Sequence, residues 1–295
     1  GLYRTLRVLE GEALSHAVYD HTSVVNLSSN NYLGLTTHPR LRQAALDAVR
    51  EFGVGSGAVR TISGTMAMHV ELERRLAAFK NVEAVVVFQS GFAANAGTVS
   101  AVLTKDDVII SDSLNHASII DGCRLSGARV VRYPHADAGA LEDLVRREGG
   151  RGRRLVVTDT VFSMDGDLAP LPDLVEVAER RGCTLMVDEA HATGVLGPTG
   201  AGALEHFGLE GRVPVVMGTL SKALGAQGGY VAGDRDLCDY LRTRDRGFVF
   251  TTALALAAAG AALAALDVVR DQPWRRERLR ELVRRLVEGA RAQGW

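Results

Sequence analysis

The sequence predicts an α/β protein in which a mostly parallel sheet is flanked by helices. Short Val- and Ile-rich runs alternate with helical patterns along most of the 295 residues, as in successive β-α units. These runs lack the strict alternation of a half-exposed strand, which indicates strands that are covered on both faces. Apolar residues make up 46% of the chain and charged residues 23%. Both values are ordinary for a globular protein and exclude a disordered chain.

The predicted strands are 84–88, 108–110, 128–132, 155–158, 184–187 and 213–217. The helices expected beside them are 39–52, 66–80, 92–103, 117–126, 138–147 and 171–181, the last opened by prolines and closed by Gly182. After Gly233 the pattern is helical only, over 234–246, 252–269 and 275–292. We therefore expect an N-terminal segment (1–35), a large α/β domain (36–265) and the incomplete start of a small C-terminal domain (266–295).

Charge and cysteine content narrow the class of protein. With 34 Lys and Arg against 35 Asp and Glu, and no basic block, neither nucleic acid nor a membrane surface is an expected partner. The longest apolar run, 253–266, is too short to span a bilayer. Cys123, Cys183 and Cys238 are odd in number and far apart, which argues against disulfides and a zinc site. The N-terminus has no apolar signal region, so we expect a cytoplasmic protein.

Residues that follow the predicted strands carry the candidate chemistry, because ligands of open α/β sheets bind at the carboxyl ends of strands. The turn from Ser90 to Asn95 opens a helix whose free N–H groups can hold a phosphate, although an ordinary helix cap is the alternative. His116 follows the second strand, with capping or packing as its alternative role. Asp165 and Asp167 form an Asp-Gly-Asp sequence that is typical of a turn, and we predict no metal there.

Asp188 and Lys222 are the most informative of these residues. Asp188 ends an apolar strand, so we expect its carboxylate to have a partner or to cap the next turn. Only three of the 34 basic residues are lysines. Lys80 ends an amphipathic helix and Lys105 lies in a polar turn, so both should be solvated. Lys222 lies among small and apolar residues, and desolvation lowers the pKa of an ammonium, as a Schiff-base lysine requires. The alternatives for Lys222 are snorkelling and phosphate binding.

Together these residues match the requirements of pyridoxal 5′-phosphate (PLP): a lysine for the aldehyde, a carboxylate for the ring nitrogen, a flat group over the ring and an anion pocket. Sequence motifs of other enzyme classes are absent or lie in the wrong context. The glycines of 53–57 follow a helix rather than a strand, which removes the context for dinucleotide binding by an oxidoreductase. The sequence also has no P-loop, no Gly-x-Ser-x-Gly and no His-Glu-x-x-His.

Seven ordered stretches, spread over nearly the whole chain, carry a family resemblance: Asn30-Asn31-Tyr32-Leu33-Gly34-Leu35, Gly55-Ser56-Gly57 through Arg60 to Ser63-Gly64-Thr65, Ser90–Asn95, Asp112–Ser118, Phe162–Asp167, Asp188–Gly194 and Gly218–Gly225. The sequence resembles the α-oxoamine synthases, PLP enzymes that condense an amino acid with an acyl-CoA. The resemblance implies the type I fold of PLP-dependent transferases, with 36–265 as the PLP-binding domain and a truncated small C-terminal domain.

The resemblance implies a role for each matching residue. Lys222 would bind the cofactor aldehyde and later remove the α-proton of the amino acid. Asp188 would pair with the ring nitrogen, and His116 would stack on the ring. His191 and Ser163 would lie near the phenolic oxygen.

The remaining implied roles concern the phosphate and the substrate. Ser90, Gly91, Phe92 and Thr219 would hold the phosphate, and Asn30 would help to bind the substrate carboxylate. Members of the family form homodimers that share the site, and Thr251-Thr252 would reach the phosphate of the partner subunit.

Two departures from the family pattern limit how far these roles carry over. Ala255-Leu256 stand where the family usually has prolines. The C-terminal domain that supplies an arginine for the substrate carboxylate is largely missing. A non-catalytic fragment or subunit with the PLP fold is therefore the rival.

The family branch is predicted from local likeness. The stretches 30–32, 63–65 and 112–118 look most like glycine C-acetyltransferase, whereas 90–95 looks equally like 8-amino-7-oxononanoate synthase. The position of Thr65 is often Asn in the synthases that use alanine. We therefore expect condensation of glycine with acetyl-CoA to give a 2-amino-3-oxo acid or an α-amino ketone, with alanine plus a pimeloyl thioester as the alternative.

Overall fold

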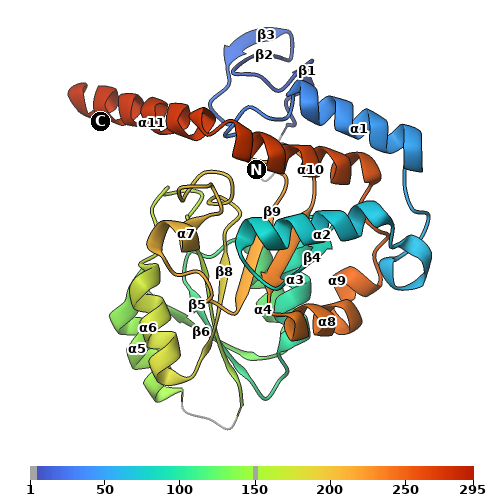
Figure 1. The fold of residues 1–295 in the computed structure, drawn as a ribbon. Coiled ribbons are helices and arrows are strands. Elements are labelled where there is room, and N and C mark those ends of the chain that lie inside the picture. Colours follow the sequence, from blue (N-terminus) through green and yellow to red (C-terminus); the bar gives the residue numbers. More distant parts are fainter. Residues whose placement is uncertain (1–4, 149–151) are drawn as a thin grey trace.

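The computed structural model describes residues 5–148 and 152–295. These residues form a central sheet of seven strands in the order β4-β10-β9-β8-β7-β5-β6 (Figure 1). β10 runs antiparallel to both of its neighbours, and the other neighbouring strands are parallel. The strands are β4 (Ala84–Phe88), β5 (Val108–Asp112), β6 (Arg129–Tyr133), β7 (Arg154–Asp159), β8 (Thr184–Asp188), β9 (Val215–Thr219) and β10 (Gly229–Gly233).

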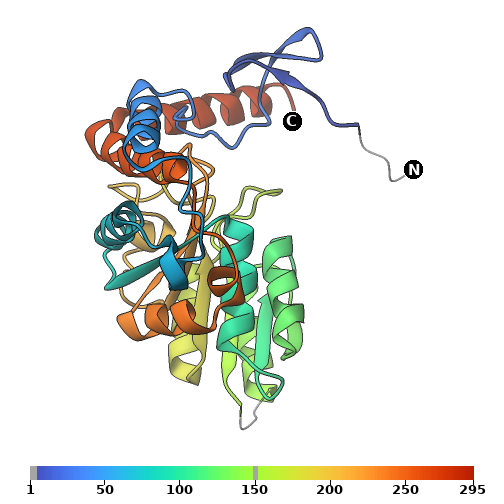
Figure 2. The ribbon, with the colours of Figure 1, turned by 90° about the vertical axis from the view of Figure 1, so that its right-hand side faces the viewer.

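Helices cover both faces of this sheet (Figure 2). Alternate residues of β4 show the two faces, because Val85 and Val87 enter one hydrophobic core while Val86 and Phe88 enter the other. Complete burial of each such side chain contributes about 1.5–3 kcal/mol. The first core also contains residues of α2 (Ala67–Lys80), α5 (Ala138–Arg147), α6 (Leu171–Arg181) and α7 (Ala203–Phe207). The second contains residues of α3 (Gly91–Val102), α4 (Ala117–Ser126), α8 (Arg235–Arg244) and α9 (Arg246–Val249).

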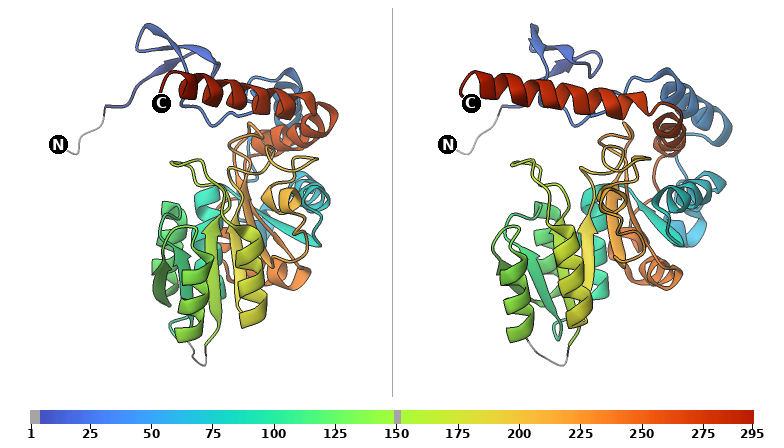
Figure 3. Two further views of the ribbon diagram at one scale, coloured as in Figure 1. Left: turned by 90° about the vertical axis from the view of Figure 1, so that its left-hand side faces the viewer. Right: turned by 60° about the vertical axis from the view of Figure 1, so that its left-hand side comes forward.

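A further layer lies beyond one end of the sheet (Figure 3). It contains a small antiparallel sheet of β1 (Leu9–Glu10), β2 (His16–Tyr19) and β3 (Thr22–Val25), with α1 (Pro39–Phe52), α10 (Leu256–Asp271) and α11 (Trp274–Ala292). α10 packs against α1 and α2. The boundary predicted at residues 265/266 falls inside α10, and the division into domains stays a prediction. Within the described ranges, no helix combines the length and the apolar character needed to cross a membrane.

The predicted fold class is confirmed, with several local differences. β10 was not predicted, because its five residues begin and end with glycine and do not form a longer apolar run. The helix predicted over 234–246 divides at Asp245, whose side chain accepts hydrogen bonds from the N–H groups of Gly247 and Phe248 and so caps α9. A short π-helix, Arg60–Gly64, was also not predicted.

Lys80 is not solvated, contrary to the prediction. Its side chain is only 4% exposed and forms an ion pair with the Glu189 carboxylate. The amphipathic pattern of α2 could not reveal this partner, because Glu189 lies 109 residues further along the chain. Lys105 is exposed, as predicted.

Candidate functional site

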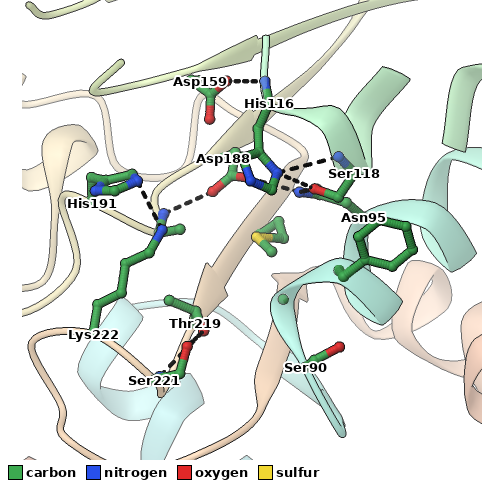
Figure 4. Close-up of a pocket in the computed structure, with 14 residues that line it drawn as sticks. Ser90, Asn95, His116, Ser118, Asp159, Asp188, His191, Thr219, Ser221 and Lys222 are labelled. Carbon is green, nitrogen blue, oxygen red and sulfur yellow. Dashed lines mark hydrogen bonds between the residues drawn. The ribbon is translucent and has the colours of Figure 1, made fainter. Parts of the chain in front are cut away.

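A cavity of about 230 Å³ lies at the carboxyl ends of the central strands (Figure 4). The turns and helix starts that follow β4, β5, β7, β8 and β9 meet there, as expected for an open α/β sheet. The described residues that line the cavity are Ser90, Gly91, Phe92, Asn95, His116, Ser118, Asp159, Asp188, Ala190, His191, Met217, Thr219, Ser221 and Lys222.

Lys222 begins a chain of hydrogen bonds at one side of the cavity. Its Nζ lies 2.8 Å from His191 Nε2, and His191 Nδ1 lies 2.7 Å from the Tyr32 hydroxyl. Burial, with lesser contributions from Lys222 and His116, lowers the pKa of His191 to about 4. His191 is therefore neutral at pH 7. Its Nε2 accepts from the Lys222 amine, and its Nδ1–H donates to Tyr32, which donates in turn to Asn30 Oδ1 at 3.0 Å.

The Lys222 amine, which begins this chain of hydrogen bonds, is less basic than a solvated lysine. Burial lowers the pKa of Lys222, although Asp188 and Asp159 act in the opposite direction. A lower pKa increases the fraction of neutral amine, which is the form that attacks a carbonyl or accepts a proton from carbon.

Asp188 belongs to a second hydrogen-bonded group on the floor of the cavity. Asn95 Nδ2 donates to Asp188 Oδ2 at 2.7 Å and to Ser118 Oγ at 2.9 Å, and the Ala190 N–H donates to Asp188 Oδ1 at 2.8 Å. Ser118 Oγ in turn lies 2.7 Å from His116 Nδ1. This group fixes both the carboxylate and the imidazole that face the cavity.

Asp159 places a second carboxyl group beside Asp188. It accepts a hydrogen bond from the His116 N–H at 2.8 Å. Burial and the neighbouring Asp188 raise the pKa of Asp159 to about 8. Asp159 is therefore protonated at neutral pH and adds no full negative charge to the site.

The end of the cavity away from Asp159 is built to hold an anion. Ser90 caps α3 by accepting the Ala93 N–H at 3.1 Å, and the first N–H groups of a helix have no partner within it. Thr219 Oγ1 and Ser221 Oγ lie 2.7 Å apart on the facing loop. A Cβ at Gly91 would lie 2.9 Å from Met217 Cε and 3.5 Å from Thr219, so a side chain there would fill this cradle. Figure 4 shows Ser90, Thr219 and Ser221 together, apart from Asp159.

The cavity thus fits PLP. It combines a partly desolvated lysine, a buried carboxylate held by two hydrogen bonds, an imidazole at the cavity wall and an anion cradle at one end. Among the described residues, the buried Asn95 Oδ1 has no hydrogen-bond partner. This oxygen could accept a hydrogen bond from a polar group of a bound cofactor.

The structure brings together eight of the predicted site residues: Ser90, Gly91, Phe92, His116, Asp188, His191, Thr219 and Lys222. Ser163 instead lines a neighbouring groove that shares His191 with the cavity. Asn30 is exposed, and its side chain accepts the Tyr32 hydroxyl. Thr252 pairs with Val59 in an isolated bridge, beside Thr251. The roles of these residues stay predictions.

Sequence reasoning assigned no role to Asn95, Ser118, Asp159 or Ser221, which also line the cavity. Asn95, Ser118 and Ser221 lie inside three of the family-like stretches, which is the one signal that could have found them. Asp159 directly follows the strand predicted at 155–158, and nothing in the sequence reveals that Asp188 lies beside it.

Comparisons with known proteins agree with this site. Residues 22–295 match the family model of aminotransferase class I and II. An 8-amino-7-oxononanoate synthase from Symbiobacterium thermophilum is 53% identical over 98% of this chain and 74% of its own length. The Bacillus subtilis 8-amino-7-oxononanoate synthase 1 is 52% identical over 95% of this chain and 71% of its own length.

Two solved structures extend the likeness to three dimensions. A serine palmitoyltransferase from S. paucimobilis with a bound PLP-myriocin aldimine superposes with a TM-score of 0.95 at 34% identity, over 98% of this chain and 73% of that one. An 8-amino-7-oxononanoate synthase from Francisella tularensis has a TM-score of 0.74 at 31% identity, over 85% of this chain and 70% of that one.

The chain therefore belongs to the aminotransferase class I and II family and, within it, to the PLP-dependent α-oxoamine synthases. These enzymes are C-acyltransferases that act on an amino acid and an acyl thioester. The expectation that the substrates are glycine and acetyl-CoA is wrong, because the curated relatives that are 52–54% identical are 8-amino-7-oxononanoate synthases rather than glycine C-acetyltransferases.

Thr65, on which the choice of branch partly rested, binds within its own segment. Its hydroxyl donates to the Arg60 carbonyl at 2.6 Å and accepts from Arg60 Nε at 3.0 Å. Thr65 therefore closes the short π-helix, and it is not among the described residues that line the cavity.

Proposed function

We propose that this protein is an 8-amino-7-oxononanoate synthase, which condenses L-alanine with a pimeloyl thioester. The observation that carries the proposal is the similarity to relatives of that name, at 53% identity over 98% of the chain. The cavity supports it, because an amine, a buried carboxylate and an anion cradle face the same space.

The chemistry of the proposal starts from Lys222. When bound, PLP supplies an electron sink that stabilises negative charge at Cα of the amino acid. Lys222 Nζ would bind the cofactor and then take the proton from that Cα. His191 would orient the amine through the 2.8 Å contact with Nζ. Because His191 is neutral, it can accept an N–H from the amine without competing for the catalytic proton.

The other residues would bind and orient the cofactor. Asp188, fixed by Asn95, would pair with the ring nitrogen, and His116 would stack on the ring. Ser90, Gly91, Phe92 and Thr219 would hold the phosphate at the N-terminus of α3, where the helix dipole favours an anion.

We also propose a cytoplasmic homodimer that shares its two sites. Two exposed apolar side chains support an interface near Thr251. Phe250, its neighbour in the sequence, is 68% exposed. Ile62, in the π-helix that contacts α9, is 83% exposed. Thr251 and Thr252 would reach the phosphate in the partner subunit. The three cysteines are free thiols, in keeping with a reducing compartment.

A substrate comparison tests the function. Purified protein loaded with PLP is mixed with pimeloyl-CoA and either L-alanine or glycine, and products are identified by mass spectrometry. We expect 8-amino-7-oxononanoate from alanine and at least tenfold less condensation with glycine. Preferred use of glycine would overturn the proposal, and failure of both amino acids to react or to perturb the cofactor absorbance would favour the non-catalytic rival.

The dimer has its own test. Mixing Lys222→Ala protein with Thr251→Ala/Thr252→Ala protein should give more activity than either alone if the two subunits share a site. Sedimentation as a monomer at micromolar concentration would contradict the dimer.

A further inference from the structure

A buried ion pair joins Lys80 at the end of α2 to Glu189, which lies between the cavity-lining residues Asp188 and Ala190 in the turn after β8. Their side chains are 4% and 0% exposed. Glu189 follows Asp188, and the same turn carries His191. We propose that Lys80 and Glu189 are positioning residues, which hold the Asp188–His191 turn in the geometry that binds and orients the cofactor. The inference rests on the proposed roles of Asp188 and His191.

Glu189 connects the turn to three other parts of the fold. Its N–H donates to the Met217 carbonyl of β9 at 2.8 Å. Its carbonyl accepts the N–H groups of Ala192 at 3.0 Å and Thr193 at 2.8 Å. Its carboxylate accepts the Leu204 N–H at 2.8 Å in addition to the Lys80 ammonium. A shift of the Glu189 side chain would therefore be transmitted to the backbone on either side of His191.

Lys80 connects the same turn to the loop before α7. Its Nζ donates to the Ala201 carbonyl as well as to Glu189. A Cβ at Gly202, whose φ is +131°, would overlap the Glu189 carboxylate, so this loop passes against the ion pair too closely for any side chain. The ammonium thus lies in a space bounded by two loops, where the wider guanidinium of arginine would displace them.

The residue type itself is informative. Arginine outnumbers lysine 31 to 3 among the 34 basic residues, yet position 80 holds a lysine. A buried ion pair is weak evidence for stability, because desolvation of both charges offsets their attraction, whereas such pairs can specify one geometry. Here the ion pair would specify the geometry of the turn that carries Asp188 and His191.

The other side of the turn is held by a hydrogen bond to β10. The Thr193 hydroxyl lies 2.9 Å from the hydroxyl of Tyr230, which is buried in β10. Loss of the ion pair should therefore displace the turn without unravelling it, which makes the effect on the cavity measurable in folded protein.

The test uses Lys80→Met, Glu189→Gln and the double variant, with the exposed Lys105→Met as the matched control. The first readout is the titration of His191 in protein without cofactor, followed by NMR of histidine side chains and assigned with a His191→Asn variant. His191 faces Lys222, His116 and Tyr32. The second readout is the dissociation constant for PLP, and the third is the thermal unfolding temperature.

We expect Lys80→Met to raise the pKa of His191 towards its ordinary value, because water enters beside the displaced turn, and to weaken PLP binding at least tenfold. The double variant should recover unfolding temperature, since neither charge is left unpaired, but should keep the altered His191 titration and the weak PLP binding. Lys105→Met should match the wild type in all three readouts.

A purely structural role would give a different result. If the His191 titration and PLP affinity of Lys80→Met and of the double variant match the wild type, or if the double variant restores them together with stability, the proposal is overturned. If the single variant Lys80→Met fails to fold, the His191 titration and the PLP affinity of the double variant test the proposal instead. Because the histidine titration uses neither cofactor nor substrate, it does not depend on whether the enzyme uses alanine.

Discussion

Asp159 and Asp188 occupy the same register on the neighbouring parallel strands β7 and β8, so two carboxyl groups face one cavity side by side. They differ in their hydrogen bonds. Asp188 accepts from Asn95 and from the Ala190 N–H, whereas Asp159 accepts from the His116 N–H. Burial and the neighbouring carboxyl raise the pKa of Asp159 to about 8. One member of the pair thus stays protonated under conditions in which a solvated aspartate would be ionised.

This difference predicts how stability depends on pH. The unfolded chain releases the Asp159 proton near pH 4, and the folded chain keeps it until about pH 8. The folded state therefore binds the extra proton across this window, and its stability should fall as pH rises through it. Asp159→Asn removes the titration, so its loss of stability between pH 5 and 8 should be smaller than that of the wild type.

The measurement is urea unfolding of cofactor-free protein at several pH values. Asp143→Asn serves as the control, because Asp143 is an exposed aspartate paired with Arg146. Parallel curves for the wild type and Asp159→Asn would contradict the assignment of a raised pKa to Asp159.

Lys222→Ala should reduce turnover by at least about 10²–10⁴, the usual contribution of a positioned acid or base. It should also abolish the covalent cofactor adduct that borohydride traps, as read by mass spectrometry of peptides containing residue 222. Turnover at the wild-type rate would disprove the role of Lys222.

Gly91→Ala should weaken PLP binding at least tenfold with little change in folding. The new methyl group would lie 2.9 Å from Met217 Cε and would fill the anion cradle. Gly289→Ala is the control, since a Cβ at Gly289 meets no atom within 4 Å and helical alanine is favoured over glycine. Titration of the cofactor absorbance checks both variants, and equal PLP affinity in the two would argue against a phosphate beside Gly91.

Tyr32→Phe should lower the rate of condensation by about 3–10-fold while leaving PLP affinity unchanged. It removes one hydrogen bond, worth about 0.5–1.5 kcal/mol, from His191 Nδ1, whose contact with the Tyr32 hydroxyl fixes which ring nitrogen carries the proton. Tyr240→Phe removes a comparable surface hydrogen bond, from its hydroxyl to the Ala101 carbonyl. Steady-state kinetics that show equal rates for the two variants would exclude an orienting role for Tyr32.

Sequence patterns predicted the parts of this molecule that depend on local composition. The run at 84–88 became β4 with the predicted bounds, because five consecutive apolar residues before a Ser-Gly turn define a buried strand. Asp188 and Lys222 were found because each has an unusual residue type for its surroundings.

Features that depend on distant partners were missed. Lys80 looks like any lysine at the end of an amphipathic helix until Glu189 is placed against it. The raised pKa of Asp159 depends on a carboxylate from another strand. Thr65 is a local exception, because its hydroxyl binds Arg60, which lies only five residues earlier in the chain. For Lys80 and Asp159 the deciding contact is tertiary and leaves no trace in nearby sequence.

The position of β10 has a consequence for how the chain is assembled. The two walls of the anion cradle follow β4 and β9, and these strands are separated in the sheet by β10. A side chain at Gly229, the first residue of β10, would overlap the backbone of Ser90. β10 (residues 229–233) is therefore needed to hold β4 and β9 in one sheet, and only then do Ser90 and Thr219 face each other. The phosphate site is therefore completed only after β10 has been made, long after its first wall.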